Sequence, residues 1–288
     1  MSAAMTGHWT APALIREGAR RLRPDGRHEA EWLLERLLDT PAADLCLDPA
    51  RQVPFDIAER FLEAVARRAT GEPLQYLLGQ TEFFGRTFDV APGVFIPRPE
   101  TEVIVDRAAA ALRARQSRLG RPLRILDLGV GSGCIGVTLA CELSACLVVG
   151  VELSWTALET ARRNARRHRV ETRVRFIQGS WTAALRGTFD GLVTNPPYIS
   201  SAQIDHLPPD VRQEPRLSLD GGPDGLAALA HLMAQAPRVV QPGGVFALEC
   251  GEDQAARLKR SAGPEWADAI ETVYDLAGRP RGLIVTRR

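Results

Sequence analysis

The run Asn195-Pro196-Pro197-Tyr198 contains the residues best suited to chemistry, and it directly follows the apolar, strand-like stretch 190–194. Two prolines end a strand abruptly, because neither has a backbone N–H to donate and each fixes φ. The Asn195 side-chain oxygen and the Pro196 carbonyl oxygen therefore form two rigidly held acceptors. They could orient a planar –NH2 group, either a carboxamide or an adenine 6-amino group, while its nitrogen forms a new bond.

The remaining residues of this run fit the same role. The ring of Tyr198 can pack on the flat face of a bound amide or base. Such an arrangement acts mainly by positioning the nitrogen for in-line attack and requires no general base. The alternative is that Asn195–Tyr198 is a rigid loop with a packed tyrosine and no chemical role.

A second group of candidate residues lies in the stretch 125–136, ILDLGVGSGCIG, which is typical of a strand, a glycine turn and a helix start. Gly129, Gly131 and Gly133 allow the backbone to approach a ligand closely, and the helix N-terminus offers free N–H groups. In open α/β folds such a turn lies at the carboxyl edge of the sheet, where ligands bind.

An acid accompanies this turn, since Glu152 ends the next strand-like run. Its carboxylate can accept hydrogen bonds from both hydroxyls of a ribose, so the two features together predict an adenosine-containing cofactor. The dinucleotide pattern G-x-G-x-x-G is present from Gly131 to Gly136, but Gly129 and Asp127 fit S-adenosylmethionine better. The alternatives are a tight turn without a ligand, and Glu152 as a helix-capping acid.

Strand, turn and helix patterns alternate from residue 124 onward, which predicts a parallel sheet covered by helices on both faces. The strand-like runs are 124–129, 146–153, 174–179, 190–195 and 243–250. The last stretch, 271–288, has no room for a crossover helix and predicts an antiparallel hairpin at the sheet edge. Asn195 ends the fourth run, so we expect it at the same edge as the glycine turn.

Amphipathic helical patterns fill the first 70 residues or so, for example in 28–40 and 54–71. Aromatic and β-branched residues around Gly85 and Pro92-Gly93 then predict a hairpin. The expected domains are an N-terminal helical domain (1–74), a β-hairpin linker (75–98) and an α/β domain (99–288).

Composition sets limits on the partners and the compartment. The chain has 288 residues, 45% of them hydrophobic, and a net charge of +1, so no global charge attracts it to nucleic acid. Its five cysteines form no CxxC pair or Cys/His cluster, which predicts a reducing compartment and no metal site. The N-terminus has no signal-peptide pattern, and no stretch approaches the ~20 apolar residues of a membrane span. We expect a cytoplasmic protein.

The combination of glycine turn, Glu152 and Asn-Pro-Pro-Tyr resembles the amino-methyltransferases that share an (N/D)PP(Y/F) motif. Three further stretches narrow the resemblance to the glutamine methyltransferases of peptide-chain release factors: GEPLQYLLGQTEFFG (71–85), FIPRPETE (95–102) and DVRQEPRLSLDGGPDGL (210–226). The similarity covers essentially the whole chain. It implies a Rossmann-like class I S-adenosylmethionine-dependent methyltransferase domain, with a seven-stranded, mostly parallel sheet, preceded by a small helical substrate-recognition domain.

The resemblance also implies a substrate, the Gly-Gly-Gln glutamine of class 1 release factors, methylated on its side-chain nitrogen, with neither a membrane nor nucleic acid as a direct partner. The implied contacts to S-adenosylmethionine are Asp127, Gly129, Val130, Gly131, Ser132, Gly133, Glu152, Trp181 (beside the adenine) and Asn195. The implied contacts to the glutamine amide are Phe95, Asn195, Pro196, Pro197 and Tyr198, with Asn195, Pro196 and Tyr198 as the catalytic set. This chain has Ser180 where the family often has an acid before the tryptophan, so the polar contact to the adenine amine is weaker or supplied by another residue.

Other interpretations remain open from the sequence. A ribosomal-protein glutamine methyltransferase is the nearest relative, although the segment Pro97–Glu102 differs there. An adenine-N6 methyltransferase would use the same motif, but it needs a basic groove and a flipped base. A noncatalytic cofactor-binding module is disfavoured because both the cofactor motif and the amide-holding motif are intact. A nicotinamide dehydrogenase is disfavoured because it would not explain Asn-Pro-Pro-Tyr.

Overall fold

A computed structural model of the chain describes residues 9–22, 26–183 and 185–288, while residues 1–8, 23–25 and 184 lie outside the described residues. Two compact units make up this structure. The first extends to Gly79 and includes residues 209–213, and the second contains residues 80–208 and 214–288. None of the described helices combines the length and apolar character needed to cross a membrane.

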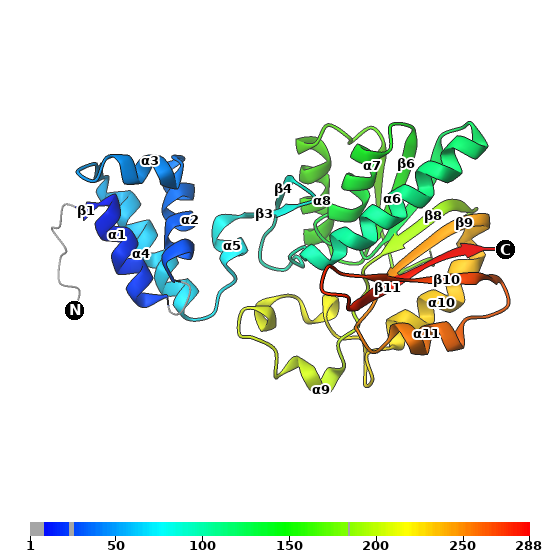
Figure 1. The fold of residues 1–288 in the computed structure, drawn as a ribbon. Helices are drawn as coiled ribbons and strands as arrows, with labels where there is room; N and C mark the ends of the chain where they lie inside the picture. Colours follow the sequence, from blue (N-terminus) through cyan, green and yellow to red (C-terminus); the bar gives the residue numbers. More distant parts are fainter. Residues whose placement is uncertain (1–8, 23–25, 184) are drawn as a thin grey trace. The chain divides into compact units, whose positions relative to one another are not determined.

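The first unit is helical, as the amphipathic patterns predict (Figure 1). Its elements are β1 (Trp9–Thr10), α1 (Ala11–Arg21), α2 (Gly26–Leu38), α3 (Ala42–Leu47), β2 (Gln52–Val53), α4 (Phe55–Ala69), α5 (Leu74–Leu78) and the 3-10 turn η1 (Val211–Gln213). Helix α4 buries Ala58, Phe61 and Val65, which share one helical face. A Cβ at Gly18 of α1 would lie 2.8 Å from both Ala30 Cβ and Phe61 Cζ, so the glycine lets α1, α2 and α4 pack closely.

The predicted hairpin opens the second unit as β3 (Gln80–Phe83) and β4 (Arg86–Asp89), which pair antiparallel. Its two-residue turn has φ of +55° at Phe84 and +65° at Gly85, the left-handed conformation that tight hairpins require. Asn164 of α8 (Trp155–Arg167) anchors the far end of the hairpin. Its Oδ1 accepts from Asp89 N at 2.7 Å and its Nδ2 donates to Asp89 O at 3.0 Å.

A seven-stranded sheet forms the centre of the second unit and confirms the predicted fold class. Its strands are β5 (Leu123–Leu128), β6 (Cys146–Glu152), β7 (Val174–Gln178), β8 (Phe189–Thr194), β9 (Val240–Glu249), β10 (Trp266–Tyr274) and β11 (Pro280–Arg287). The spatial order is β10-β11-β9-β8-β5-β6-β7. Strands β5 to β9 run parallel to one another, and β11 pairs antiparallel with both β9 and the edge strand β10. The expected edge hairpin is therefore confirmed.

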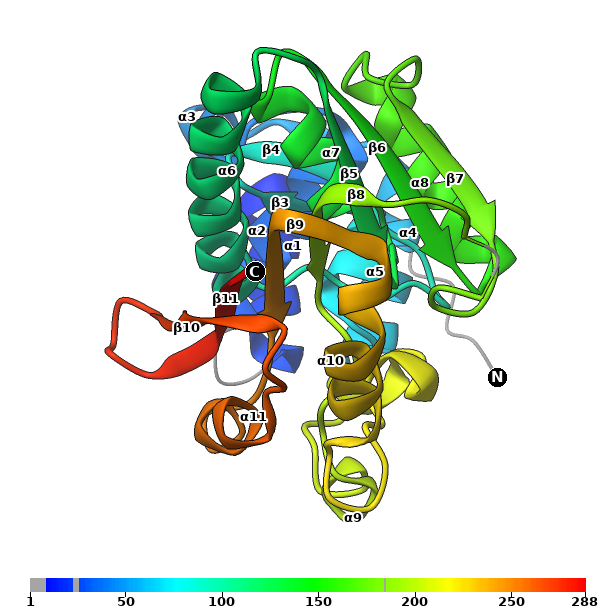
Figure 2. The same ribbon diagram turned by 90° about the vertical axis from the view of Figure 1, so that its right-hand side faces the viewer.

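Helices cover both faces of this sheet, as buried parallel strands require (Figure 2). The second unit's helices are α6 (Pro99–Leu119), α7 (Cys134–Glu142), α8, α9 (Ser201–Ile204), the 3-10 turn η2 (Arg216–Ser218), α10 (Ala227–Val239) and α11 (Ala255–Ser261). Helices α6, α7 and α8 pack on one face, and α10 and α11 pack on the other. Alternate residues of each strand enter the two cores, for example Ile125 and Leu126 of β5.

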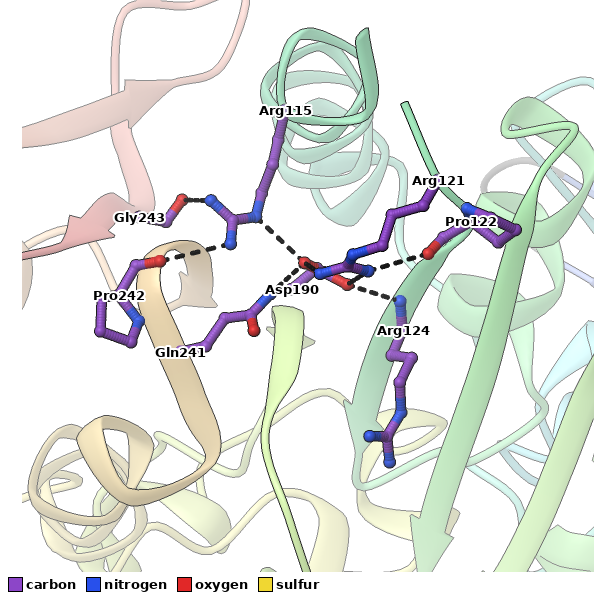
Figure 3. Close-up of polar contacts among 8 residues, drawn as sticks. All are labelled: Arg115, Arg121, Pro122, Arg124, Asp190, Gln241, Pro242 and Gly243. Atoms are coloured by element: carbon purple, nitrogen blue, oxygen red, sulfur yellow. Dashed lines mark hydrogen bonds and ion pairs between the residues drawn. The ribbon is translucent and has the colours of Figure 1, made fainter. Parts of the chain in front are cut away.

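A buried carboxylate closes the amino end of the sheet, as Figure 3 shows. Asp190 of β8 is 1% exposed and accepts two hydrogen bonds of 2.9 Å from the Arg121 guanidinium. It also accepts from Arg124 N at 2.9 Å, from Arg115 Nε at 3.3 Å and from the amide of Gln241. This cluster joins α6, β5, β8 and β9 at the edge where their parallel strands begin.

Candidate active site

The carboxyl ends of three neighbouring parallel strands bring the motif residues together. Leu128 of β5 is in register with Thr194 of β8, and Thr194 is in register with Leu248 of β9. Asn195, the residue after β8, consequently lies beside both the glycine turn that follows β5 and Glu249, the last residue of β9. The Thr194 hydroxyl donates to Leu128 O at 2.7 Å and fixes the ends of β5 and β8 to one another.

The glycine turn has the conformation that a ligand cradle needs. Gly129 and Gly131 have φ of +72° and +55°, which residues with a Cβ adopt only with strain. A Cβ at Gly129 would lie 4.0 Å from both Asn195 O and Trp181 Cζ3, so it would enter the space between the Asn-Pro-Pro-Tyr loop and the tryptophan. Glu152 supports the turn, since its Oε2 accepts from Gly131 N at 3.0 Å.

Two of the predicted cofactor residues lie beneath this turn rather than on its open side. Asp127 is 1% exposed, and its Oδ2 accepts from Gly136 N at 2.9 Å. Burial raises the pKa of this carboxyl to about 7, opposed by the Gly136 hydrogen bond and assisted by the charge of Glu152. Gly133 is the N-cap residue of α7, and a Cβ there would lie 3.0 Å from Ala161 Cβ, so this glycine allows α7 and α8 to pack together.

A cavity of about 690 Å³ opens above the turn, inside the second unit. The predicted residues that line it are Phe95, Gly129, Val130, Gly131, Ser132, Glu152, Trp181, Asn195 and Pro197. Asp127, Gly133, Pro196 and Tyr198 are not among the lining residues. The volume lies in the range of roughly 300–1,000 Å³ that is usual for small-molecule sites.

These residues fit the predicted cofactor. Glu152 accepts one N–H on each oxygen, from Gly131 and from Ser154, and each oxygen keeps a lone pair for a ribose hydroxyl. Trp181 has φ of +47°, a conformation rare for a large residue and typical of binding sites. Ser180 and His231 line the same cavity as Trp181, and the His231 ring centroid lies 6.3 Å from that of Trp181.

The Asn195 amide is held from one side. Its Nδ2 donates to Thr101 Oγ1 at 3.1 Å, so its Oδ1 is the end that faces away from Thr101. Thr101 belongs to the PRPETE segment at the start of α6, is 2% exposed, and lines the same cavity. An amide fixed in this way presents an acceptor to any –NH2 group in the cavity.

Tyr198 turns away from the cavity toward the sheet. Its hydroxyl donates to Glu249 Oε1 at 3.1 Å, and its ring packs on the hydrophobic core formed with α10 and α11. Burial raises the pKa of this phenol above its usual value, and the nearby Glu249 charge raises it further. Tyr198 thus remains a hydrogen-bond donor at neutral pH.

The segment 215–222 packs directly on the Asn-Pro-Pro-Tyr loop. Ile199 N donates to Leu219 O at 3.0 Å, and Gly221 N donates to Ile199 O at 2.8 Å. A Cβ at Gly221 would lie 2.8 Å from Tyr198 Cα and 2.9 Å from Pro197 O, so the Gly-Gly pair of this segment allows backbone contact. The segment also supplies Leu217, Ser218 and Asp220 to the cavity wall.

Sequence reasoning missed several residues of this site, chiefly Thr101, Glu249 and His231. Glu249 carried a signal, because an acid that ends a parallel strand lies at the ligand-binding edge, as Glu152 does. Thr101 lay within a quoted motif but was given no role. His231 lies on a helix with no motif, so the sequence held no signal for it.

Comparison with known proteins identifies the chain's family. The family model for the PrmC N-terminal domain matches residues 13–79, and the model for the methyltransferase small domain matches residues 86–207. A release factor glutamine methyltransferase of Nitratidesulfovibrio vulgaris is 40% identical over 297 aligned residues, covering 100% of this chain and 98% of that protein. The chain belongs to the release factor glutamine methyltransferase family.

A second relative agrees with this assignment, and a solved structure shares the fold. The release factor glutamine methyltransferase of Moorella thermoacetica is 42% identical, with 94% of this chain and 96% of that protein covered. Among solved structures, the hMettl16 catalytic domain in complex with the MAT2A 3′UTR hairpin 1 has a TM-score of 0.54 at 15% identity. It covers 80% of each chain and shows a shared fold.

Membership of this methyltransferase family confirms the predicted enzyme class, with S-adenosylmethionine as the cofactor. The relatives are named release factor glutamine methyltransferases, which favours glutamine methylation over the adenine-N6 alternative and a release factor over a ribosomal protein as the substrate. The resemblance drawn from Asn195–Tyr198 and the PRPETE segment is therefore confirmed.

Proposed function

We propose that this protein transfers a methyl group from S-adenosylmethionine to the side-chain amide nitrogen of the Gly-Gly-Gln glutamine in class 1 release factors. The observation that carries the proposal is the Asn195 amide, which borders the cofactor turn and whose nitrogen is engaged by Thr101. Its oxygen is left to accept from the glutamine –NH2 group. The close similarity to curated release factor glutamine methyltransferases supports the same substrate.

The chain's residues would act by holding the two reactants in line. Glu152 and the turn Gly129–Gly133 would hold the ribose and methionine parts of the cofactor, and Trp181 would lie beside its adenine. Bound there, S-adenosylmethionine supplies a methyl group on a positively charged sulfur, and the C–S electron pair remains on that sulfur as the C–N bond forms. Asn195 Oδ1 and Pro196 O would accept the amide hydrogens and stabilise positive charge on the nitrogen until one proton leaves to solvent.

The two parts of the chain would have separate roles. We propose that the N-terminal helical domain (1–74) recognises the release factor and that the hairpin segment 75–98 links it to the methyltransferase domain (99–288). A substrate that acts in translation also implies a cytoplasmic enzyme. Removal of residues 1–74 is expected to abolish methylation of intact release factor while leaving S-adenosylmethionine binding unchanged, which calorimetry can measure.

A methyl-transfer assay with labelled S-adenosylmethionine tests the substrate assignment. The acceptors are purified release factor, its variant with alanine in place of the Gly-Gly-Gln glutamine, and duplex DNA. We expect label only on the unmodified release factor, and its loss with Asn195→Ala. Label on DNA would instead mean that the same acceptors hold an adenine amine, and the proposed substrate would be wrong.

A further inference from the structure

A buried acid lies directly behind the Asn-Pro-Pro-Tyr loop. Glu249, the last residue of β9, is 1% exposed. Its Oε1 accepts from the Tyr198 hydroxyl at 3.1 Å, whereas its Oε2 has no hydrogen-bond partner of good geometry within the described part of the chain. A buried acceptor without a partner costs free energy, so this oxygen favours any nearby donor.

The Thr101 hydroxyl lowers the pKa of the Glu249 carboxyl and so favours its charged form, which makes Thr101 the candidate donor to the unpartnered Oε2. Thr101 Oγ1 also accepts from Asn195 Nδ2 at 3.1 Å. A hydroxyl has a single proton to donate. The direction in which Thr101 points that proton therefore decides which end of the Asn195 amide can face it.

Two arrangements of these hydrogens exist. An ionised Glu249 is an acceptor only, so it draws the Thr101 proton toward itself, and Thr101 Oγ1 can then only accept from Asn195 Nδ2. The Asn195 oxygen is left for the substrate. A neutral Glu249 can itself donate to Thr101 Oγ1, which frees the Thr101 proton to bond Asn195 Oδ1 and allows the amide to turn over.

We propose that ionised Glu249 is a positioning residue, which sets the orientation of the Asn195 amide through Thr101 and fixes Tyr198 through its hydroxyl. Glu249 does not contact the substrate in this arrangement. The inference rests on the proposed function for its effect on turnover, but the orientation of the amide is a property of the free protein and can be measured without substrate.

The electrostatic surroundings place this switch near neutral pH. Burial raises the pKa of Glu249 to about 7, and the Thr101 and Tyr198 hydrogen bonds oppose that rise. The titratable and charged groups that act on or lie beside this carboxyl are Tyr198, Glu100, Arg281, Cys134 and Cys250. As pH rises through about 7 the carboxyl loses its proton, so the productive orientation gains population with rising pH.

Isosteric variants separate this role from a merely structural one. Thr101→Val keeps the shape but removes the hydroxyl, while Thr101→Ser retains the hydroxyl. Glu249→Gln puts a permanent –NH2 donor in the place of the carboxylate. Thr138→Val is the matched control, because Thr138 of α7 is equally buried and its hydroxyl has no hydrogen-bond partner among the described residues.

We expect Thr101→Val and Glu249→Gln to lower kcat on release factor at least tenfold, with the Kd for S-adenosylmethionine changed less than about twofold. Thr101→Ser should recover most of the lost kcat, and Thr138→Val should match wild type. The pKa of Asp127 is also raised to about 7, so the kcat–pH profiles of wild type and Glu249→Gln must be compared. We expect kcat to rise with pH through about 7 in wild type and to show no such rise in Glu249→Gln. If Thr101→Val and Glu249→Gln fold and keep the wild-type kcat while Asn195→Ala is inactive, the positioning role is overturned and the proposed function stands.

A measurement without substrate keeps the inference testable if release factor is not the acceptor. The side-chain amide NMR signal of Asn195, assigned by its loss in Asn195→Ala, should shift with a midpoint near pH 7. The shift should be absent in Glu249→Gln and Thr101→Val. An Asn195 signal that does not respond to pH in wild type would overturn the inference whatever the substrate is.

Discussion

Replacing Asp190 should destabilise the second unit more than replacing any one of its exposed partners. Asp190 is 1% exposed and receives hydrogen bonds from two guanidinium groups, one backbone N–H and one side-chain amide (Figure 3). Arg115, one of these partners, is itself 7% exposed. Asp190→Ala would therefore leave a buried guanidinium without its counter-charge.

Removing one partner of a buried ion pair typically costs about 3–5 kcal/mol. Arg115 also donates to the carbonyl oxygens of Pro242 and Gly243, which remain after the substitution, so we expect the lower end, about 3 kcal/mol. With a slope of about 3 kcal/mol per molar urea, the unfolding midpoint should fall by about 1 M. Urea titration followed by the fluorescence of buried Trp266 measures this shift.

Arg121→Ala is the matched control, because the Arg121 side chain is 45% exposed and Asp190 keeps its other donors. Arg121→Ala should lower the unfolding midpoint clearly less than Asp190→Ala does. Equal losses in the two variants, or a midpoint unchanged in Asp190→Ala, would refute the reasoning that burial makes this carboxylate the centre of the cluster.

The pH dependence of this stability has a definite sign. Burial alone would raise the pKa of Asp190, but the hydrogen bonds from Arg121 and Arg124 N lower it below its usual value. The ion pairs therefore contribute fully above the unfolded-state pKa of about 3.9 and are lost as pH falls through the lower, folded-state value. The stability difference between wild type and Asp190→Asn should accordingly shrink in strong acid.

Three further substitutions test the cofactor side of the site. Gly136→Ala would place a Cβ 2.8 Å from buried Asp127 Oδ2. We expect a lower melting temperature in scanning calorimetry and weaker S-adenosylmethionine binding, and wild-type values for both would contradict the expected crowding. Asn164→Ala removes the 2.8 Å hydrogen bond to Ser132 O and should raise the Kd for S-adenosylmethionine several-fold, whereas an unchanged Kd would show that the turn holds its shape alone. Trp181→Ala should raise the same Kd about tenfold in calorimetry with little effect on kcat, and a loss confined to kcat would place Trp181 at the substrate instead.

Much of the fold followed from local chemistry. Alternating strand and helix patterns specify a parallel sheet, because each buried strand needs cover on both faces. The Gly129–Gly133 turn, Glu152 and Asn195 could be placed at one edge from strand order alone, since the carboxyl ends of parallel strands coincide. The short link around Gly278 excluded a crossover helix, so the antiparallel edge hairpin was also predictable.

What the sequence did not reveal depends on side-chain direction and on distant partners. Tyr198 follows the two prolines, but its hydroxyl reaches Glu249, 51 residues later, and no local pattern indicates that pairing. Asp127 and Gly133 match the cofactor motif, yet they support the turn from beneath. The Asp127 side chain is buried, and Gly133 lies against Ala161 of α8. Asp190 likewise binds partners up to 75 positions away in the chain.

The central claim, that Asn195 directs methyl transfer to a glutamine side chain, can be tested most directly by mass spectrometry of treated release factor. Release factor would be incubated with S-adenosylmethionine and either wild-type enzyme or Asn195→Ala, then digested and fragmented. We predict the mass of one added methyl group on the Gly-Gly-Gln peptide, located on the glutamine side chain, with wild-type enzyme only. A methyl group on another residue, or equal modification by Asn195→Ala, would contradict the account.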